Sequence, residues 1–566
     1  MDVRTASPPG QCDVVVIGAG MGGLTAAALL SRAGLSVQVL EMDARPGGYL
    51  AGFRRKDFRF DSAIHWLNQL GPKGIVTRVF EAIGADHPKA APQTLIKRYK
   101  GRSFDYLLTN RPDDLKAQLI RDFPSDRPGI ERFFCDAKRL GKAFDGMGSF
   151  FRTEESMPRW ERPLHMMKKL RFALPFIPHL RFSGSAGIDK GLRKYFSDAR
   201  LRTVFASEMD ILSCLVPVAW AYYGDYQMPP IGGSQVIPEW LCHAIEKLGN
   251  TVHYHYRVNE VLVEQGQAVG VRYTQRRSER EIRCKAVVAA CDVEALYERM
   301  LPSAAVPEKL KAKLREAELY PSSITVSLGL DKPAQELGFG EEMIFLCDES
   351  VPRERQCSGL AEESGISILA PSLRDPSLAP AGMGTLTLYI PADFNLHAQW
   401  HTSEGAERGG AYEALKKDYA DRLIARVEKS IAPGLSQHVV WCDVATPITH
   451  WRYTGNRNGS IMGARPGKKN FQLGIAHYRT PVKQLYLGGH WAELGGGVPI
   501  ATRAGANAAL LVLRDMAHPA ARPLAQYMDG RLTPADLDKS GNFRSYPGDW
   551  VREATPAEKR AARAGV

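Results

Sequence analysis

Apolar positions near the start of the chain fall into two short blocks separated by a run of helix-forming residues. Residues 13–17 (DVVVI) are mostly β-branched and end at a glycine, which is typical of a buried parallel strand. Leu24 to Arg32 is rich in alanine and leucine and stops at Gly34, and residues 36–40 (SVQVL) form the second apolar block. The pattern therefore predicts a strand, a helix and a strand, the β-α-β unit of an α/β fold.

The same apolar stretch allows a second interpretation. Val14 to Ser31 is an uncharged run of 18 residues, long enough for a membrane helix. Its four glycines would pack such a helix poorly, and the leader ahead of it lacks the features of a signal peptide. A strand, a turn and a helix fit the run better.

Strand-like and helix-like segments recur further along the chain. Residues 231–292 predict a helix followed by four strands, the last of them a buried run at 286–290 (AVVAA). Beyond residue 300 the predicted elements are strands at 323–330, 385–390 and 485–487 and helices near 411–431 and 501–514.

This distribution predicts two domains formed from a chain of 566 residues. A discontinuous α/β domain would take residues 12–84, 229–300 and 480–515. An inserted mixed α+β domain would take residues 85–228, which look largely helical, and 301–479. Residues 516–566 are polar, contain proline and are rich in arginine, so we expect a peripheral or partly disordered tail.

A glycine motif occupies the turn between the first strand and the first helix. Gly18 permits the tight turn, Gly20 lets the backbone approach a pyrophosphate, and Gly23, next to Gly22, allows close helix–sheet packing. The phosphates would then lie at the helix N-terminus, where free N–H groups favour anions. Glu41, which follows the second strand, is expected to bind the adenosine ribose hydroxyls, and a carboxylate there disfavours NADP.

Two further glycine-rich pieces distinguish a flavin from a nicotinamide dinucleotide. Arg45, Gly47 and Gly48 follow Glu41 directly and resemble the arginine and glycine pair that approaches the flavin diphosphate in the amine oxidase superfamily. Near the other end, glycines would let the backbone approach a planar ring, and a helix would start at proline with its positive end toward that ring. The residues of this second piece are Gly489, Gly496, Gly497, Val498 and Pro499.

With these motifs, the chain resembles the phytoene desaturase, carotenoid isomerase and retinol saturase group of flavoproteins over roughly residues 13–515. The resemblance implies a Rossmann-type, glutathione-reductase-like FAD-binding domain with an inserted substrate domain, and FAD as the cofactor. It also implies that the backbone of Val258 contacts the adenine. Phe60 and Asp61, followed by His65, are closer to the retinol saturase pattern than to that of carotene desaturases.

In this group the flavin exchanges a hydride at N5, so few side chains need to act as acids or bases. His65 and His490 are the best titratable candidates beside the ring, because both lie in segments expected to line it; a purely structural role is at least as common. Residues 211–224, an uncharged stretch with three aromatic residues, would line a hydrophobic tunnel or form a core helix.

Charge adds a possible membrane partner. The chain carries a formal charge of +12 and a pI near 9.1, and residues 158–182 combine six basic residues with apolar ones. This pattern suits a segment lying on an anionic bilayer, through which a lipid-like substrate would arrive, or an ordinary solvated face. No nucleic-acid motif is present, and the nine scattered cysteines form no metal-ligand spacing and indicate a reducing compartment.

We therefore expect an FAD-dependent oxidoreductase that desaturates, saturates or isomerises carbon–carbon double bonds of an apolar isoprenoid or polyene. It would be cytoplasmic, or peripheral at the inner face of the membrane. An amine oxidase that acts on C–N bonds and a non-catalytic flavin-binding partner in a biosynthetic complex remain as alternatives. The substrate itself, the direction of the reaction and the electron partner stay open.

Overall fold

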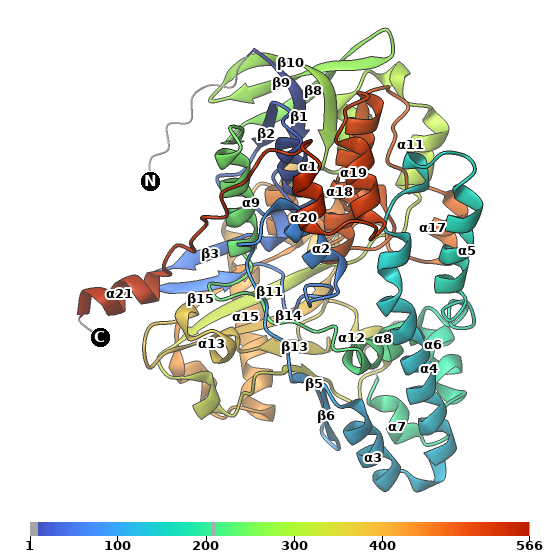
Figure 1. The fold of residues 1–566 in the computed structure, drawn as a ribbon. Coiled ribbons are helices and arrows are strands. Elements are labelled where there is room, and N and C mark those ends of the chain that lie inside the picture. The colour runs from blue at the N-terminus through green and yellow to red at the C-terminus, as the bar shows by residue number, and fades with distance from the viewer. Residues whose placement is uncertain (1–9, 206–207, 209, 565–566) are drawn as a thin grey trace.

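Two seven-stranded sheets organise the computed structural model, which describes residues 10–205, 208 and 210–564 (Figure 1). The first sheet has the order β7-β2-β1-β10-β9-β8, and β16 pairs with β10. Its strands are β1 (Gln11–Ile17), β2 (Val37–Glu41), β7 (Thr251–Tyr254), β8 (Arg257–Glu264), β9 (Gln267–Gln275), β10 (Ser278–Ala289) and β16 (Leu485–Leu487). Segments from the beginning, middle and end of the chain therefore share one sheet.

The predicted β-α-β unit is confirmed. Strands β1 and β2 run parallel and are joined by α1 (Met21–Arg32), and Glu41 is the last residue of β2. Val14 to Ile17 are buried because β1 has a parallel neighbour on each side and helices cover the sheet. The predicted α/β class is thus present in the fold, while the domain boundaries stay a prediction.

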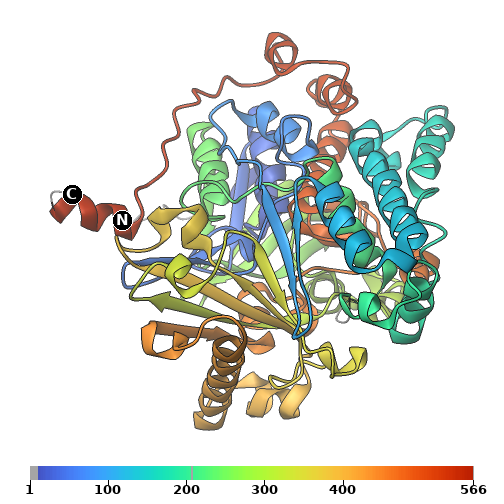
Figure 2. The same ribbon diagram turned by 90° about the horizontal axis from the view of Figure 1, so that it is seen from below.

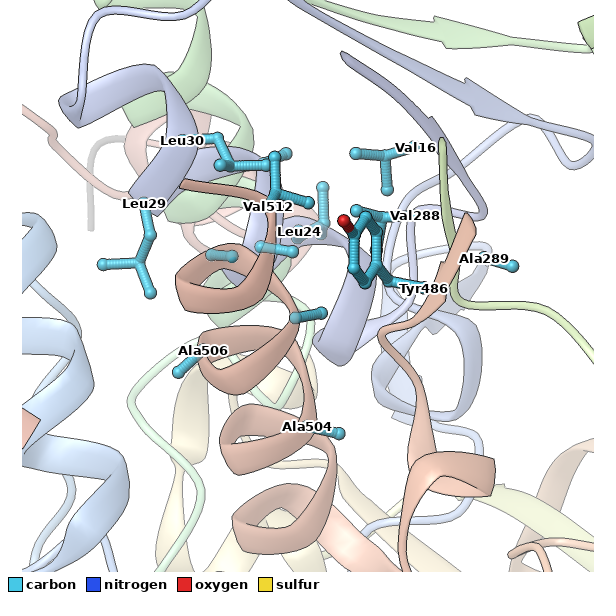
Figure 3. Packing of buried hydrophobic residues seen from close by; sticks show 14 of the residues in the cluster. Val16, Leu24, Leu29, Leu30, Val288, Ala289, Tyr486, Ala504, Ala506 and Val512 are labelled. Carbon is cyan, nitrogen blue, oxygen red and sulfur yellow. The ribbon is translucent and has the colours of Figure 1, made fainter. Parts of the chain in front are cut away.

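Three helices pack side by side against this sheet: α1, α9 (Val236–Lys247) and α18 (Gly497–Asp515). Figure 3 shows Leu24 of α1 and Val512 of α18 meeting Tyr486 of β16 in one apolar layer. A side chain at Gly505 would come within 2.2 Å of the Gly22 carbonyl oxygen, so the α1 and α18 backbones touch.

Helix α18 begins earlier than the sequence suggests. We expected Pro499 at the first helical position, ahead of the alanine-rich stretch from residue 501, whereas α18 begins at Gly497 and makes Pro499 its third residue. The first turn tolerates proline because its N–H groups have no helical acceptor. The N-terminus of α18 therefore lies inside the glycine-rich segment instead of after it.

The second sheet has the order β15-β11-β14-β13-β12-β5-β6 and is mostly antiparallel. Its strands are β5 (Leu95–Lys100), β6 (Asp105–Thr109), β11 (Ser322–Leu330), β12 (Met343–Leu346), β13 (Ile366–Leu369), β14 (Gly384–Ala392) and β15 (Val439–Ala445). The β5–β6 hairpin is the part of residues 85–228 that the sequence did not predict beside its helices, and β5 joins this sheet through β12. The predicted long helix is α15 (Gly410–Ser430).

Helices that follow the hairpin form a separate layer, which Figure 2 shows gathered on one side of the molecule. They are α3 (Pro112–Asp122), α4 (Arg127–Asp145), α5 (Arg162–Ala173), α6 (Ser185–Arg193), α7 (Ala199–Thr203) and α8 (Ile211–Tyr222). Buried rings of Phe133, Phe196 and Phe205 hold the layer together. Helix α5 differs from the rest because most of its large apolar side chains are exposed.

The C-terminal stretch, expected as a peripheral or partly disordered tail, contains three helices. They are α19 (Ala521–Met528), α20 (Pro534–Lys539) and α21 (Pro556–Ala564). Between the helices, Arg544 donates to the Leu248 carbonyl (3.0 Å) and Tyr546 to Asp86 Oδ2 (2.7 Å). Polar contacts of this kind join the tail, which has few apolar residues, to the rest of the protein.

Candidate functional site

A cavity of about 2040 Å³ lies where the two sheets meet the helical layer. Strands β2, β11, β14 and β15 contribute to its walls, as do α4, α5 and α8. Of the residues that the sequence assigns to the cofactor and to catalysis, only Gly23 does not line it; those that do are Gly18, Gly20, Gly22, Glu41, Arg45, Gly47, Gly48, His65, Val258, Gly489, His490, Gly496, Gly497, Val498 and Pro499. The fold therefore brings together motifs almost 500 residues apart.

The four glycines of the first motif serve different purposes. Gly18 has φ of +96°, which favours glycine. A side-chain carbon at Gly22 would lie 2.1 Å from the Gly488 carbonyl oxygen, and one at Gly23 would lie 2.1 Å from that of Gly18. At Gly20 such a carbon would meet nothing within 4 Å and would project into open space. The protein itself needs the other three glycines, whereas Gly20 keeps room for a ligand.

Two helix N-termini meet this space. Helix α1 begins after Gly20 and α18 after Gly496, and neither N-terminus has a side-chain cap or an acidic residue in its first turn. Their first N–H groups therefore have no helical acceptor, and both positive ends border the cavity. Such ends favour phosphate oxygens and an electron-rich ring.

Glu41 and the arginine–glycine turn flank α1. Glu41 accepts hydrogen bonds from the backbone N–H of Ala19 (2.7 Å) and of Asp43 (2.9 Å), while burial raises its pKa. Both oxygens keep lone pairs that could accept ribose hydroxyls. Gly47 has φ of +125° and donates its N–H to the Ala19 carbonyl (2.8 Å), which holds the turn against Gly20.

Arg45 and Val258 lie at the same end of the cavity. The Arg45 guanidinium donates to the Gly52 carbonyl through Nη1 (2.6 Å), so its position is fixed by the chain itself. Val258 is buried in β8, next to Arg257, which also lines the cavity. These placements suit a nucleotide end.

The residues present fit the FAD expected from the sequence. The open space at Gly20, two uncapped helix ends and a carboxylate at the end of β2 all border one cavity. Gly489, Gly496 and Gly497 line the same cavity, and the part of it bordered by these glycines, Gly20 and Glu41 is called the glycine cradle below. The glycine pieces would hold the diphosphate and the ring, and the β2 and β8 ends would hold the adenosine.

His65 lies against the second sheet. Its ring stacks on that of Tyr389 in β14, with centroids 4.2 Å apart and planes 5° apart. Burial, and then the charge of Arg374, lowers the pKa of His65 to about 3. Arg374 also donates to the His65 carbonyl oxygen (2.9 Å).

Burial places the pKa of both candidate histidines below neutral in this structure, while their catalytic role stays a prediction. Burial lowers the pKa of His490 to about 4, and its Nε2 is buried without a hydrogen-bond partner. Both rings are therefore neutral at pH 7. A third buried ring, His450, was missed; burial lowers its pKa to about 4, and its ring lies 5.8 Å from that of Tyr49, which also lines the cavity.

A series of aromatic rings continues from His65 to α5. Trp66 follows His65, its ring is 5.7 Å from Tyr226, and Tyr226 is 5.9 Å from Trp220 of α8. Phe144 of α4 lies 5.7 Å from Trp220, and the rings of Phe172 and Phe176 lie 6.0 and 5.3 Å from Phe144. All of these except Tyr226 line the cavity. Sequence pattern indicated only the α8 part, because these side chains come from separate helices.

Comparisons with known proteins give one family model, described as flavin containing amine oxidoreductase, which matches residues 21–513. The chloroplastic prolycopene isomerase of Arabidopsis thaliana is 25% identical over 534 residues, 89% of this chain and 83% of that protein. The all-trans-retinol 13,14-reductase of Danio rerio is 25% identical over 540 residues, 86% of this chain and 84% of that protein. Cyclohexylamine oxidase from Brevibacterium oxydans shares the fold, with a TM-score of 0.55 and 14% identity over 89% of this chain and 99% of that one.

Proposed function

The chain belongs to the flavin-containing amine oxidoreductase family, and we propose that it acts on carbon–carbon double bonds of an apolar polyene. As a member of that family it is an FAD-dependent oxidoreductase, and the resemblance inferred from its glycine motifs is confirmed. The relatives named for prolycopene and for all-trans-retinol support a polyene substrate. The predicted Rossmann-type fold class is confirmed as well.

The size and lining of the cavity carry the proposal. Ligand sites usually measure about 300–1,000 Å³, and this cavity of about 2040 Å³ has room for two ligands. The glycine cradle accounts for one of them. The other half is lined by the rings from His65 to Phe176, which suit a long hydrocarbon better than a small polar molecule.

The reaction would draw its redox chemistry from FAD, which when bound supplies or takes up a hydride at N5. The chain's own residues would orient the substrate and exclude water. The rings of His65 and Tyr389 stack as a neutral pair beside the cradle, and His490 adds a third neutral ring. A buried pair that carries no charge suits a polyene whose own charge changes only transiently.

Product analysis tests the proposal. Purified holoenzyme would be incubated anaerobically, and then in air, with poly-cis carotenoids, all-trans carotenoids and retinol, and the products separated by chromatography and mass spectrometry. Gain of two hydrogens means saturation, loss of two hydrogens means desaturation, and a new retention time at equal mass means isomerisation. Flavin bleaching by primary amines, with no change in any polyene, would contradict the proposal and favour C–N oxidation.

We further propose that α5 rests on an anionic membrane surface. The exposed apolar side chains of α5 and of the residues that flank it come with exposed cations at Arg159, Lys168 and Arg171. Such a patch on a protein surface marks an interaction site, and the basic residues match anionic lipid headgroups. The exposed apolar side chains are Trp160 (77%), Leu164 (57%), Met166 (54%), Met167 (62%), Leu170 (54%), Leu174 (55%) and Ile177 (49%).

The opposite face of α5 lines the cavity. Lys169, Phe172 and Ala173 border it, so one helix would separate the membrane from the substrate site. Among the described residues, no helix is long and apolar enough to cross a bilayer. The contact would therefore be peripheral, and vesicle sedimentation tests it: equal binding to neutral and anionic vesicles, or none to either, contradicts the electrostatic part.

A further inference from the structure

A polar cluster interrupts the aromatic half of the cavity. It consists of Asp225, which follows α8, and of Asn68 and Gln69, which follow Trp66. The two segments are joined through Leu67, whose N–H donates to the Gln227 carbonyl (2.8 Å) and whose carbonyl accepts in return (2.9 Å). All three polar residues line the cavity beside Trp66, Phe144 and Trp220.

Both oxygens of the Asp225 carboxylate are held in place by one residue. The backbone N–H of Gln69 donates to Oδ1 (2.6 Å), and its side-chain Nε2 donates to Oδ2 (2.7 Å). Each oxygen keeps a further lone pair. Gln69 adopts φ of +59° in this arrangement, a left-handed conformation that is strained for a residue other than glycine and that occurs at functional sites.

Asp210 at the other end of α8 provides a contrast. It borders the same cavity, but its carboxylate accepts the N–H of Ser213 (2.8 Å) and caps the helix N-terminus, which explains its presence. Asp225 lies three residues beyond the C-terminus of α8, where the helix dipole disfavours a negative charge. Burial also raises its pKa to about 6, so helix stability does not account for it.

We propose that Asp225, positioned by Gln69, determines specificity by accepting a hydrogen bond from a hydroxyl at one end of an otherwise apolar substrate. This inference rests on the proposed function and narrows it to polyene alcohols. The surrounding rings match the hydrocarbon part, while a pure hydrocarbon would remove water from the carboxylate and return no hydrogen bond. Sites built around a substrate hydroxyl reject the analogue that lacks it.

Equilibrium binding tests the inference. The probes are all-trans-retinol and the matching hydrocarbon without its hydroxyl, added to holoenzyme and followed by quenching of tryptophan fluorescence, since Trp66 and Trp220 line the cavity. We expect the wild type to prefer the alcohol by at least about tenfold, as a hydrogen bond to a charged group would give. Asp225→Leu should abolish the preference, because it should weaken binding of the alcohol and tighten binding of the hydrocarbon.

Two further variants complete the design. Asp225→Asn keeps the size of the side chain, removes its charge and should reduce the preference several-fold, which covers the case in which the leucine variant does not fold. Asp210→Asn keeps a helix cap and should leave the preference unchanged. Flavin content and melting temperature check that each variant is folded.

Different outcomes overturn different statements. The inference is overturned if both probes bind the wild type equally, or if the Asp225 variants lose the same affinity for both probes. The proposal that the protein acts on polyenes would stand in either case. Tighter binding of the corresponding polyene amine than of the alcohol also overturns it, because the carboxylate would then serve an ammonium group. If neither probe binds the wild type and no polyene is converted, the proposed function fails and the inference falls with it.

Discussion

The two halves of the cavity differ in what lines them: backbone borders one half and large side chains border the other. Around the cradle, the protein approaches its ligand with backbone: α1 and α18 touch at Gly22 and Gly505, and the N-cap residue of each helix is a glycine. Around the substrate half, large side chains from α4, α5, α8 and β14 form the walls. The half lined by backbone suits a cofactor that does not vary. The shape of the other half can change through single substitutions of its side chains.

This difference makes the two halves respond unequally to substitution. An added carbon in the cradle meets backbone, which cannot move, or takes the room of the ligand. A changed ring in the substrate half leaves space that neighbouring side chains partly fill. Four predictions test the contrast, beginning with the largest effect.

Gly20→Val should remove the cofactor without unfolding the protein. A side chain there meets no protein atom within 4 Å and occupies the space at the N-terminus of α1. We expect flavin content to fall below about a tenth of the wild-type value, because the pyrophosphate loses its place. Absorbance of the bound flavin measures the loss, and circular dichroism checks the fold.

The matched control is Gly10→Val. Among the residues that the structure describes, none comes within 4 Å of a carbon added at Gly10, which lies at the opposite end of β1 from the motif. It should keep full flavin content. A Gly20→Val protein that purifies with its flavin would show that the phosphates lie elsewhere.

Lowering the pH should reduce the stability of the folded protein through three buried histidines that line the cavity. His65, His450 and His490 have pKa values lowered to about 3, 4 and 4, so the unfolded chain binds protons that the folded one does not. Stability is then full above about pH 6.5 and falls as the pH drops toward 4. Each histidine should lower the free energy of unfolding by about 2 kcal/mol between pH 6.5 and 5, at about 1.4 kcal/mol per pH unit.

His490→Gln removes one of these groups. Urea unfolding of the holoenzyme at pH 7 and pH 5 should show a pH-dependent loss smaller by about 2 kcal/mol in the variant. The same slope in both proteins would mean that His490 takes up a proton in the folded state as readily as in the unfolded state between pH 7 and 5. His438→Gln is the control, because that ring is partly exposed and pairs with Asp331 (3.0 Å) outside the cavity.

Charge on α5 should matter for membranes and not for the cavity. Lys168→Gln with Arg171→Gln should weaken binding to anionic vesicles by about 25-fold at low salt, since each cation contributes about 1 kcal/mol near such a surface. High salt should abolish the difference. Arg276→Gln with Arg277→Gln, in the turn between β9 and β10, is the matched control; an equal loss there would point to net charge alone.

His65→Gln should have the smallest effect. A general acid contributes typically 10²–10⁴-fold, but a ring that is neutral at pH 7 contributes by shape, so turnover should fall by less than about tenfold. The pH profile between 6 and 8 should not change. A hundredfold loss together with a shifted profile would return His65 to the role of proton donor.

Local patterns were sufficient for one part of the fold. The β1–α1–β2 unit and β10 were predicted because their apolar runs and glycines lie within a few residues of one another. The pairing of β5 with β12 was not predicted, because the two strands lie more than 200 residues apart in the chain. The contacts of the tail were not predicted either, because its partners, such as Asp86, are far away in sequence.

The same limit separates the two halves of the site. A glycine of the cradle can be recognised in the sequence, because the need for glycine comes from the conformation and close packing of its own backbone. The ring series is invisible in the sequence, since Trp66, Phe144 and Trp220 become neighbours only after three separate segments pack. The lowered pKa of His65 likewise depends on burial and on Arg374, which is 309 residues away.

The placement of β10 between β1 and β16 has a consequence for synthesis of the protein. The first strand of the cradle leaves the ribosome early, whereas β16 and α18, which complete it, are made last. At about 5–20 residues per second, roughly 20–90 s separate β2 from β16. During that interval the emerging chain has half a cradle, so the cofactor can be captured only when translation is nearly finished.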